Sequence, residues 1–167
     1  MTPTKDSQPI SAAVSDLDII RKCRQVQRRI LGLDVGDKTI GLATSDIRCQ
    51  IASSLQTIAR KNLAHDSAVL AKLVREFNIA ALVIGLPLEM TGQEGRRCQS
   101  VRQFARNLQK SPDFTEMPMV FFDERLSTAV VERAMIAADL SRRKRSERID
   151  AAAAAYILQS ALDRVRQ

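Results

Sequence analysis

The stretch RILGLDVGDKTIGLAT, residues 29–44, decides the fold class of this chain. Residues 29–33 and 39–44 are short apolar runs with β-branched residues, and the segment DVGD between them has the composition of a turn. The pattern predicts two strands joined as a hairpin. Residues 51–58 can add a third strand, which would complete an antiparallel meander.

Beyond this meander, helical and strand patterns alternate. Residues 63–77 carry apolar side chains at helical spacing, and residues 80–84 form a continuous apolar run that is typical of a buried strand. There follow a helix over 95–109, a buried strand over 119–122, a helix after Ser127 and an alanine-rich helix to about residue 165. The order βββαβαβαα predicts an α/β fold, a mixed five-stranded sheet with helices on both faces.

Length and composition bound the architecture. A chain of 167 residues with 45% hydrophobic and 27% charged residues fits one globular domain. We place that domain at residues 29–167 and expect residues 1–28 to form a basic extension, either flexible or a short basic helix. The first ten residues lack the apolar core of a secretory signal, and no apolar run approaches the ~20 residues of a membrane span. We therefore expect a cytoplasmic protein without a membrane partner.

The inventory of side chains excludes several kinds of chemistry. One histidine and three cysteines without a C-x-x-C pair supply neither a zinc site nor a disulfide framework. We interpret the histidine, His65, as a helix surface residue without a catalytic role, so any catalysis must use carboxylates. The excess of 26 Lys and Arg over 19 Asp and Glu favours a nucleic-acid partner.

Three carboxylates fall at the ends of predicted elements. Asp34 ends the first strand, Glu124 follows the strand over 119–122, and Asp150 starts the final helix. Ligands of open sheets collect outside strand ends, so Asp34 and Glu124 come close if their strands are neighbours. The alanines after Asp150 permit a close approach of that helix to the sheet.

A cluster of these acids would require a cation, because converging carboxylates repel one another. Mg²⁺ or Mn²⁺ prefers such oxygen ligands, and two such ions could support cleavage of a phosphodiester. Taken singly, each acid also has a structural interpretation, as a turn residue, a strand terminus or a helix-dipole partner.

Basic residues flank the three acids along the sequence and are candidates for binding phosphates. For any one of them, a solvated surface position is the more ordinary explanation, but their clustering next to Glu124 and Asp150 favours phosphate binding. With 4% aromatic residues and no tryptophan, contacts to the nucleic-acid backbone are favoured over multiple base-stacking platforms. The candidates are Lys38, Arg96, Arg97, Arg125, Arg142, Arg143, Lys144 and Arg145.

Four ordered blocks of the sequence resemble the YqgF/RuvX family, whose members are described as RuvC-like Holliday junction resolvases and as pre-16S rRNA nucleases. The resemblance implies an RNase H-like fold in which Asp34, Glu124 and Asp150 occupy the acidic, metal-binding positions. Thr39 stands where many members carry an arginine. The four blocks are LGLDVGDKTIGLATSD (31–46), VIGLPLEMTGQEGRR (83–97), FDERLST (122–128) and IDAAAAAYILQSALD (149–163).

The resemblance also implies an activity, a metal-dependent endonuclease that uses Mg²⁺ or Mn²⁺. Its substrate would be pre-16S rRNA, processed at the 5′ end, or branched DNA, whose two-fold symmetry calls for a homodimer. Two alternatives stay open. One is a non-catalytic RNA-binding ribosome assembly factor on the same scaffold. The other is an actin-like ATPase, which shares the glycine pattern of the first hairpin but normally needs a second domain.

Overall fold

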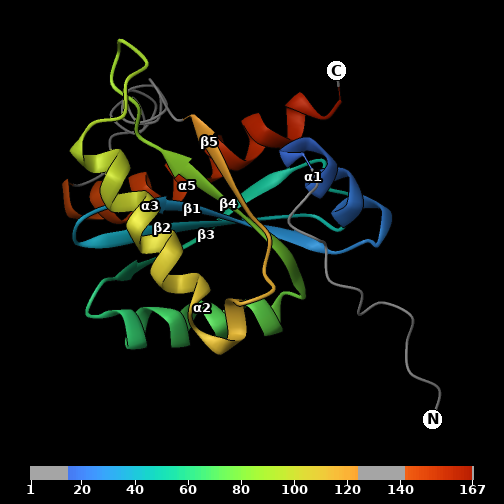
Figure 1. Ribbon diagram of the computed structural model, residues 1–167, viewed down its shortest axis with the longest axis horizontal. Helices are drawn as coiled ribbons and strands as arrows, with labels where there is room; N and C mark the ends of the chain where they lie inside the picture. Colours follow the sequence, from blue (N-terminus) through green and yellow to red (C-terminus); the bar gives the residue numbers. More distant parts are fainter. Residues whose placement is uncertain (1–14, 124–141, 167) are drawn as a thin grey trace.

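A five-stranded sheet forms the centre of the structure, a computed structural model that describes residues 15–123 and 142–166 (Figure 1). The strands lie in the order β3-β2-β1-β4-β5. The meander of the first three is antiparallel, whereas β1 pairs with β4, and β4 with β5, in parallel. This arrangement confirms the predicted α/β fold. The strands are β1 (Arg29–Val35), β2 (Thr39–Ser45), β3 (Ala52–Ala59), β4 (Ile79–Leu86) and β5 (Met119–Asp123).

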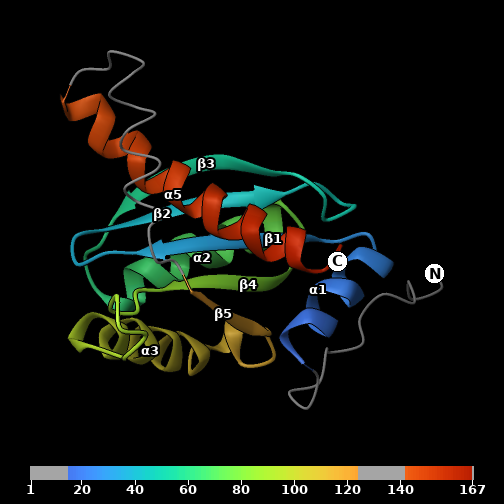
Figure 2. The same cartoon turned by 90° about the horizontal axis from the view of Figure 1, so that it is seen from above.

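Helices cover both faces of the sheet (Figure 2). On one face lie α1 (Asp16–Gln25) and α5 (Arg142–Arg164), and on the other lie α2 (Leu63–Glu76), α3 (Arg96–Gln109) and the short 3-10 helix η1 (Pro112–Phe114). Because successive strand residues point to opposite faces, each strand feeds two apolar clusters. Every residue of β4 is buried, as expected for a central strand covered on both sides.

The segment before β1 contributes to the core. Its helix α1 begins after Ser15, whose hydroxyl accepts the N–H of Asp18 at 3.3 Å. Ile19, Ile20 and Cys23 are buried in the cluster beneath α5. Of the two expectations for residues 1–28, the helix therefore holds for Asp16–Gln25, and residues 1–14 lie outside the described residues. None of the helices described is long and apolar enough to cross a membrane.

The final helix starts earlier than the sequence analysis predicts. α5 begins at Arg142, so Asp150 lies about two turns inside the helix and not at its start. Arginine and lysine are good helix formers, and residues 142–148 contain no glycine or proline that would end a helix. The basic run is therefore the first part of α5. The helix predicted after Ser127 falls within residues 124–141, which are not among the described residues.

Two glycines allow α5 to lie directly on the sheet. A Cβ atom at Gly32 of β1 would lie 2.9 Å from the Cβ of Leu158 and 3.1 Å from the carbonyl oxygen of Ala154. A Cβ atom at Gly41 of β2 would lie 2.0 Å from the carbonyl oxygen of Asp150. The alanine-rich face of α5 thus rests on strand backbone at both points, as its small side chains suggest.

Candidate functional site

The carboxyl ends of the parallel strands β1, β4 and β5 share one edge of the sheet, and β2 begins there. β4 lies between β1 and β5, so the strands that lead to Asp34 and Glu124 are not neighbours. The simplest way to bring these two acids together is thereby excluded, and two strand spacings, about 10 Å, separate the strands. Glu124 itself lies outside the described residues.

Asp34 and Asp150 both neighbour the same glycine, Gly41 of β2. Asp34 pairs with Gly41 in the β1–β2 ladder, and Gly41 touches the backbone of Asp150. Directly opposed residues of an antiparallel pair have Cα atoms about 5 Å apart. Asp34 also shares its face of the sheet with Gly32, two residues earlier, which contacts Leu158 of α5. Asp34 of β1 and Asp150 of α5 therefore both lie next to Gly41 on the same face of the sheet.

A hydrogen bond orients the carboxylate of Asp150. The Thr39 hydroxyl donates to Oδ2 of Asp150 at 2.8 Å, in a half-buried position. Thr39 is held in turn by the hairpin, because its carbonyl oxygen accepts the N–H of Gly36 at 2.9 Å. Sequence analysis identified Thr39 only as a departure from the arginine of many family members. Its partner is 111 positions away, so no local pattern marks this contact.

Arg60, directly after β3, anchors the turn between β1 and β2. Its Nη1 donates to the carbonyl oxygen of Gly36 at 2.7 Å, and its backbone N–H donates to the carbonyl oxygen of Lys38 at 2.8 Å. The guanidinium also lies 5.1 Å from the ring centroid of Phe104 and 3.8 Å from the buried carboxylate of Asp66. Sequence analysis missed Arg60, because its contacts join four separate elements.

A second arginine holds the loop between β4 and α3. Nε of Arg102 donates to both carboxylate oxygens of Glu94 at 3.0 Å, and its guanidinium lies 4.8 Å from the ring centroid of Phe121. These hydrogen bonds from Arg102 hold the pKa of Glu94 below its usual range. Arg96 and Arg97 follow this loop and are both exposed.

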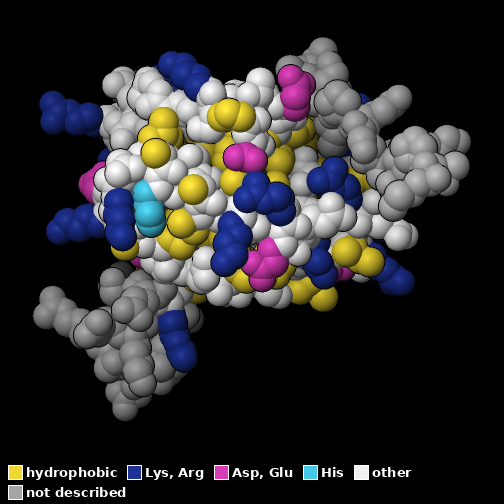
Figure 3. All heavy atoms as spheres, turned by 90° about the horizontal axis from the view of Figure 1, so that it is seen from below, with side chains coloured by type: hydrophobic (Ala, Val, Ile, Leu, Met, Phe, Trp, Pro, Cys, Tyr) yellow, Lys and Arg dark blue, Asp and Glu magenta, His cyan; other side chains and the backbone are white. Residues whose placement is uncertain are grey.

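The predicted phosphate-binding residues are only partly described. Lys38, Arg96 and Arg97 are exposed at the edge where β2 begins and β4 ends. On the face seen in Figure 3, Lys and Arg side chains are spread from the end that carries His65 over the middle to the opposite end. Arg125 lies outside the described residues. The remaining four lie in the first turn of α5, where no side chains are described: Arg142, Arg143, Lys144 and Arg145.

The described part of the chain does not assemble a complete metal centre. Among residues 15–123 and 142–166, no group of three His, Cys, Asp or Glu side chains is placed to hold a metal ion. Asp34 and Asp150 supply two carboxylates at one edge, and carboxylate oxygens are the ligands that Mg²⁺ and Mn²⁺ prefer. The donor chemistry therefore fits such an ion, with Glu124 as the predicted third ligand.

The sequence of this chain is similar to those of known proteins. The RuvX family model, described as Holliday junction resolvase, matches residues 28–164. A protein of Roseobacter denitrificans is 51% identical over 83% of this chain and 85% of its own length. A protein of a Chelativorans species is 46% identical over 92% of this chain and 94% of its own length. Both are named "Putative pre-16S rRNA nuclease".

One solved structure with a similar fold is Thermus thermophilus RuvC in complex with a Holliday junction substrate. It superposes with a TM-score of 0.51 at 14% identity, over 82% of this chain and 95% of that one. At this level of identity the likeness concerns the fold alone. It confirms the RNase H-like fold that the sequence blocks imply.

Proposed function

Because the chain belongs to the RuvX family, whose model matches residues 28–164, we propose that it is a metal-dependent endonuclease with Asp34, Glu124 and Asp150 as catalytic acids. The observation that carries this assignment is the contact between α5 and β2. Asp150 rests on Gly41, the ladder partner of Asp34, so two acids that are distant in sequence share one sheet edge. Cleavage of a phosphodiester by divalent metal ions can use such acids without a histidine.

Precursor 16S rRNA, cut at its 5′ end, is the substrate that we propose. The names of the curated relatives, which cover most of this chain, support it. The description of the family model and the RuvC fold support branched DNA as the second candidate. Strand-symmetric cutting of a four-way junction would additionally require a two-fold dimer of this chain.

The chain's own residues have separate tasks around a divalent ion. Asp34 and Asp150, with Glu124, would hold Mg²⁺ or Mn²⁺ through their carboxylates. The bound ion would supply a water activated for attack and stabilise the leaving oxygen. Thr39 orients the carboxylate of Asp150 through its hydroxyl. Lys38, exposed on the anchored hairpin, would neutralise a backbone phosphate of the substrate.

Removal of the metal tests the proposal. With Mg²⁺ or Mn²⁺, the purified protein should cut a precursor rRNA fragment or a four-way DNA junction, assayed side by side on a denaturing gel. EDTA should abolish cutting, and an excess of either ion should restore it. Metal-independent cutting would contradict the proposal. Salt-dependent RNA binding without any product would instead support the non-catalytic assembly factor.

Loss of the Thr39 hydroxyl should impair the site without removing a metal ligand. We expect Thr39→Val to slow cleavage by about ten- to hundredfold, as removal of outer partners of metal ligands commonly does. The valine keeps the shape of the side chain but cannot donate to Asp150. The Mg²⁺ concentration that gives half-maximal cleavage should therefore also rise. Thr39→Ser, which keeps the donor, should stay near wild type in a titration of rate against Mg²⁺. A wild-type titration curve for Thr39→Val would show that the hydrogen bond is dispensable.

A further inference from the structure

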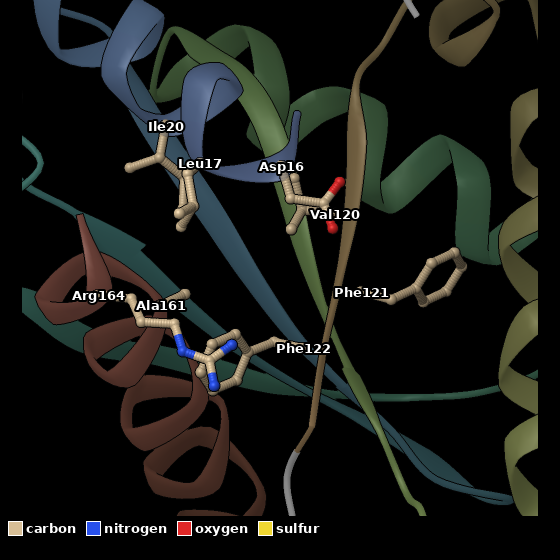
Figure 4. A pocket seen from close by; sticks show the side chains of 8 residues that line it. All are labelled: Asp16, Leu17, Ile20, Val120, Phe121, Phe122, Ala161 and Arg164. Atoms are coloured by element: carbon tan, nitrogen blue, oxygen red, sulfur yellow. The ribbon is translucent and has the colours of Figure 1, made fainter. Parts of the chain in front are cut away.

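A trough of about 510 Å³ lies between α1, α5 and β5, on the face of the sheet that carries α5 (Figure 4). Leu17 and Ile20 of α1, Val120 and Phe122 of β5, and Ala161 of α5 form its apolar walls. Pockets that bind small ligands commonly have volumes of about 300–1,000 Å³. The trough is therefore large enough to hold a planar ring.

Two opposite charges border the trough, one from each helix. The guanidinium of Arg164 lies 5.2 Å from the ring centroid of Phe122, within the distance of a cation–π contact. Asp16, the first residue of α1, reaches toward β5 from the other side (Figure 4). Both side chains are exposed, and neither forms an ion pair or a side-chain hydrogen bond with the described residues. The trough thus offers an aromatic–guanidinium surface and a carboxylate acceptor.

One wall of the trough, Phe122 of β5, lies at the level of the candidate catalytic edge. Phe122 pairs with Gly85 of β4, and the pairing of Leu33 with Ile84 places Asp34 at the level of Gly85. Phe122 packs in the cluster beneath α5, so it shares a face with Asp34. Two strand spacings, about 10 Å, separate them. The residue between them is a glycine, which places no side chain in the way.

We propose that the trough binds one unpaired base of the nucleic-acid substrate and that it favours cytosine over uracil, an inference that rests on the proposed nuclease function. Aromatic rings and arginine guanidinium groups stack on any base. An acidic side chain, by contrast, accepts a hydrogen bond from the exocyclic N4 amino group of cytosine. Uracil presents a carbonyl oxygen at that position, which the carboxylate of Asp16 would repel. A single stacking position also agrees with the low aromatic content of the chain.

Binding without cleavage tests the assignment. Full-length protein in EDTA is titrated into fluorescent pentanucleotides of cytidine or uridine, and the affinity is read from fluorescence anisotropy. We expect the cytidine pentamer to bind about five- to tenfold more tightly. Asp16→Asn should abolish or reverse the preference, because the Asn amide can donate to the carbonyl oxygen of uracil. Arg164→Lys should weaken both pentamers at least about fivefold, because an ammonium keeps the charge but has no planar face.

Matched variants on the other face of the molecule control for net charge. Asp113→Asn, next to α3, and Arg106→Lys, within α3, should leave both affinities unchanged. Phe122→Leu, which keeps an apolar wall but removes the ring, should weaken both pentamers as Arg164→Lys does. Equal affinity of the wild type for the two pentamers would overturn the proposal, and so would wild-type behaviour of Asp16→Asn and Arg164→Lys.

The outcome is separable from that of the nuclease assay. A protein that selects cytosine in EDTA but never cuts RNA or DNA with Mg²⁺ or Mn²⁺ would overturn the nuclease function and support the base site. A protein that cuts with metal but binds both pentamers equally, with or without Asp16, would overturn the base site and support the nuclease.

Discussion

Asp34→Asn should reduce metal-dependent cleavage by about a thousandfold or more, the largest effect that we expect from one substitution. The amide keeps the shape of the side chain but lacks the charge that a divalent cation requires. Metal ions supply several kcal/mol of transition-state stabilisation, and about 1.4 kcal/mol corresponds to a factor of ten in rate. The rate of product formation at saturating Mg²⁺ measures the loss. Equal cutting by Asp34→Asn and wild type would remove Asp34 from the catalytic site.

The fold of Asp34→Asn should remain intact, and thermal unfolding provides the control. Without metal, the variant should still unfold in one cooperative transition, because the amide keeps the size and shape of the carboxylate. Asp37→Asn is the matched substitution, since Asp37 is an exposed acid in the same hairpin. It should retain cleavage within a few-fold of wild type. A comparable loss in Asp37→Asn would indicate that hairpin charge in general, and not Asp34, governs the rate.

Gly41→Ala should have the second-largest effect, on both stability and activity. The new Cβ atom would lie 2.0 Å from the carbonyl oxygen and 2.2 Å from the carbonyl carbon of Asp150. Both are backbone atoms, so the overlap cannot be relieved by rotation of a side chain, and α5 must shift away from β2. We expect a loss of about 3 kcal/mol in the free energy of unfolding, at the upper end of the range for overpacking. Urea denaturation measures this loss.

The same shift should carry Asp150 away from Asp34, so cleavage should fall together with stability. Gly95→Ala provides the contrast, because its Cβ atom would lie 2.5 Å from Oε1 of Glu89, the end of a flexible side chain. That side chain can rotate, so Gly95→Ala should cost less than about 1 kcal/mol. An unfolding free energy of Gly41→Ala equal to that of Gly95→Ala would show that α5 does not rest on β2 as described.

Local patterns in the sequence were sufficient for most of the fold. Local residue patterns mark both the type and the ends of several elements: the β1–β2 hairpin, the buried strand β4 and the helices α2 and α3. The start of α5 was wrong because a run of basic residues resembles a charged loop, although its residues favour a helix. The sequence also left open whether residues 16–25 form a helix. This segment has few apolar residues, and they stabilise the helix only through their contacts with the core.

The candidate site was harder to predict than the fold, because its geometry depends on long-range pairing. The position of β4 between β1 and β5 results from parallel pairing, and no residue pattern in these strands indicates which strands pair. The hydrogen bond from Thr39 to Asp150 and the anchoring of the hairpin by Arg60 arise only after the elements pack. The catalytic and phosphate-binding roles of all the candidate residues stay predictions, and two of these residues, Glu124 and Arg125, also lie outside the described residues.

The contact between α5 and β2 has a consequence for the timing of synthesis. The ribosome makes Asp34 early, whereas the helix that carries Asp150 emerges more than a hundred residues later. Domains commonly begin to fold while the chain is still being made. On the proposed assignment, a nascent chain with a complete sheet would still lack one of its catalytic acids, so it could not yet cleave a nucleic acid. Docking of α5 on β2 would then be the folding step that completes the proposed site.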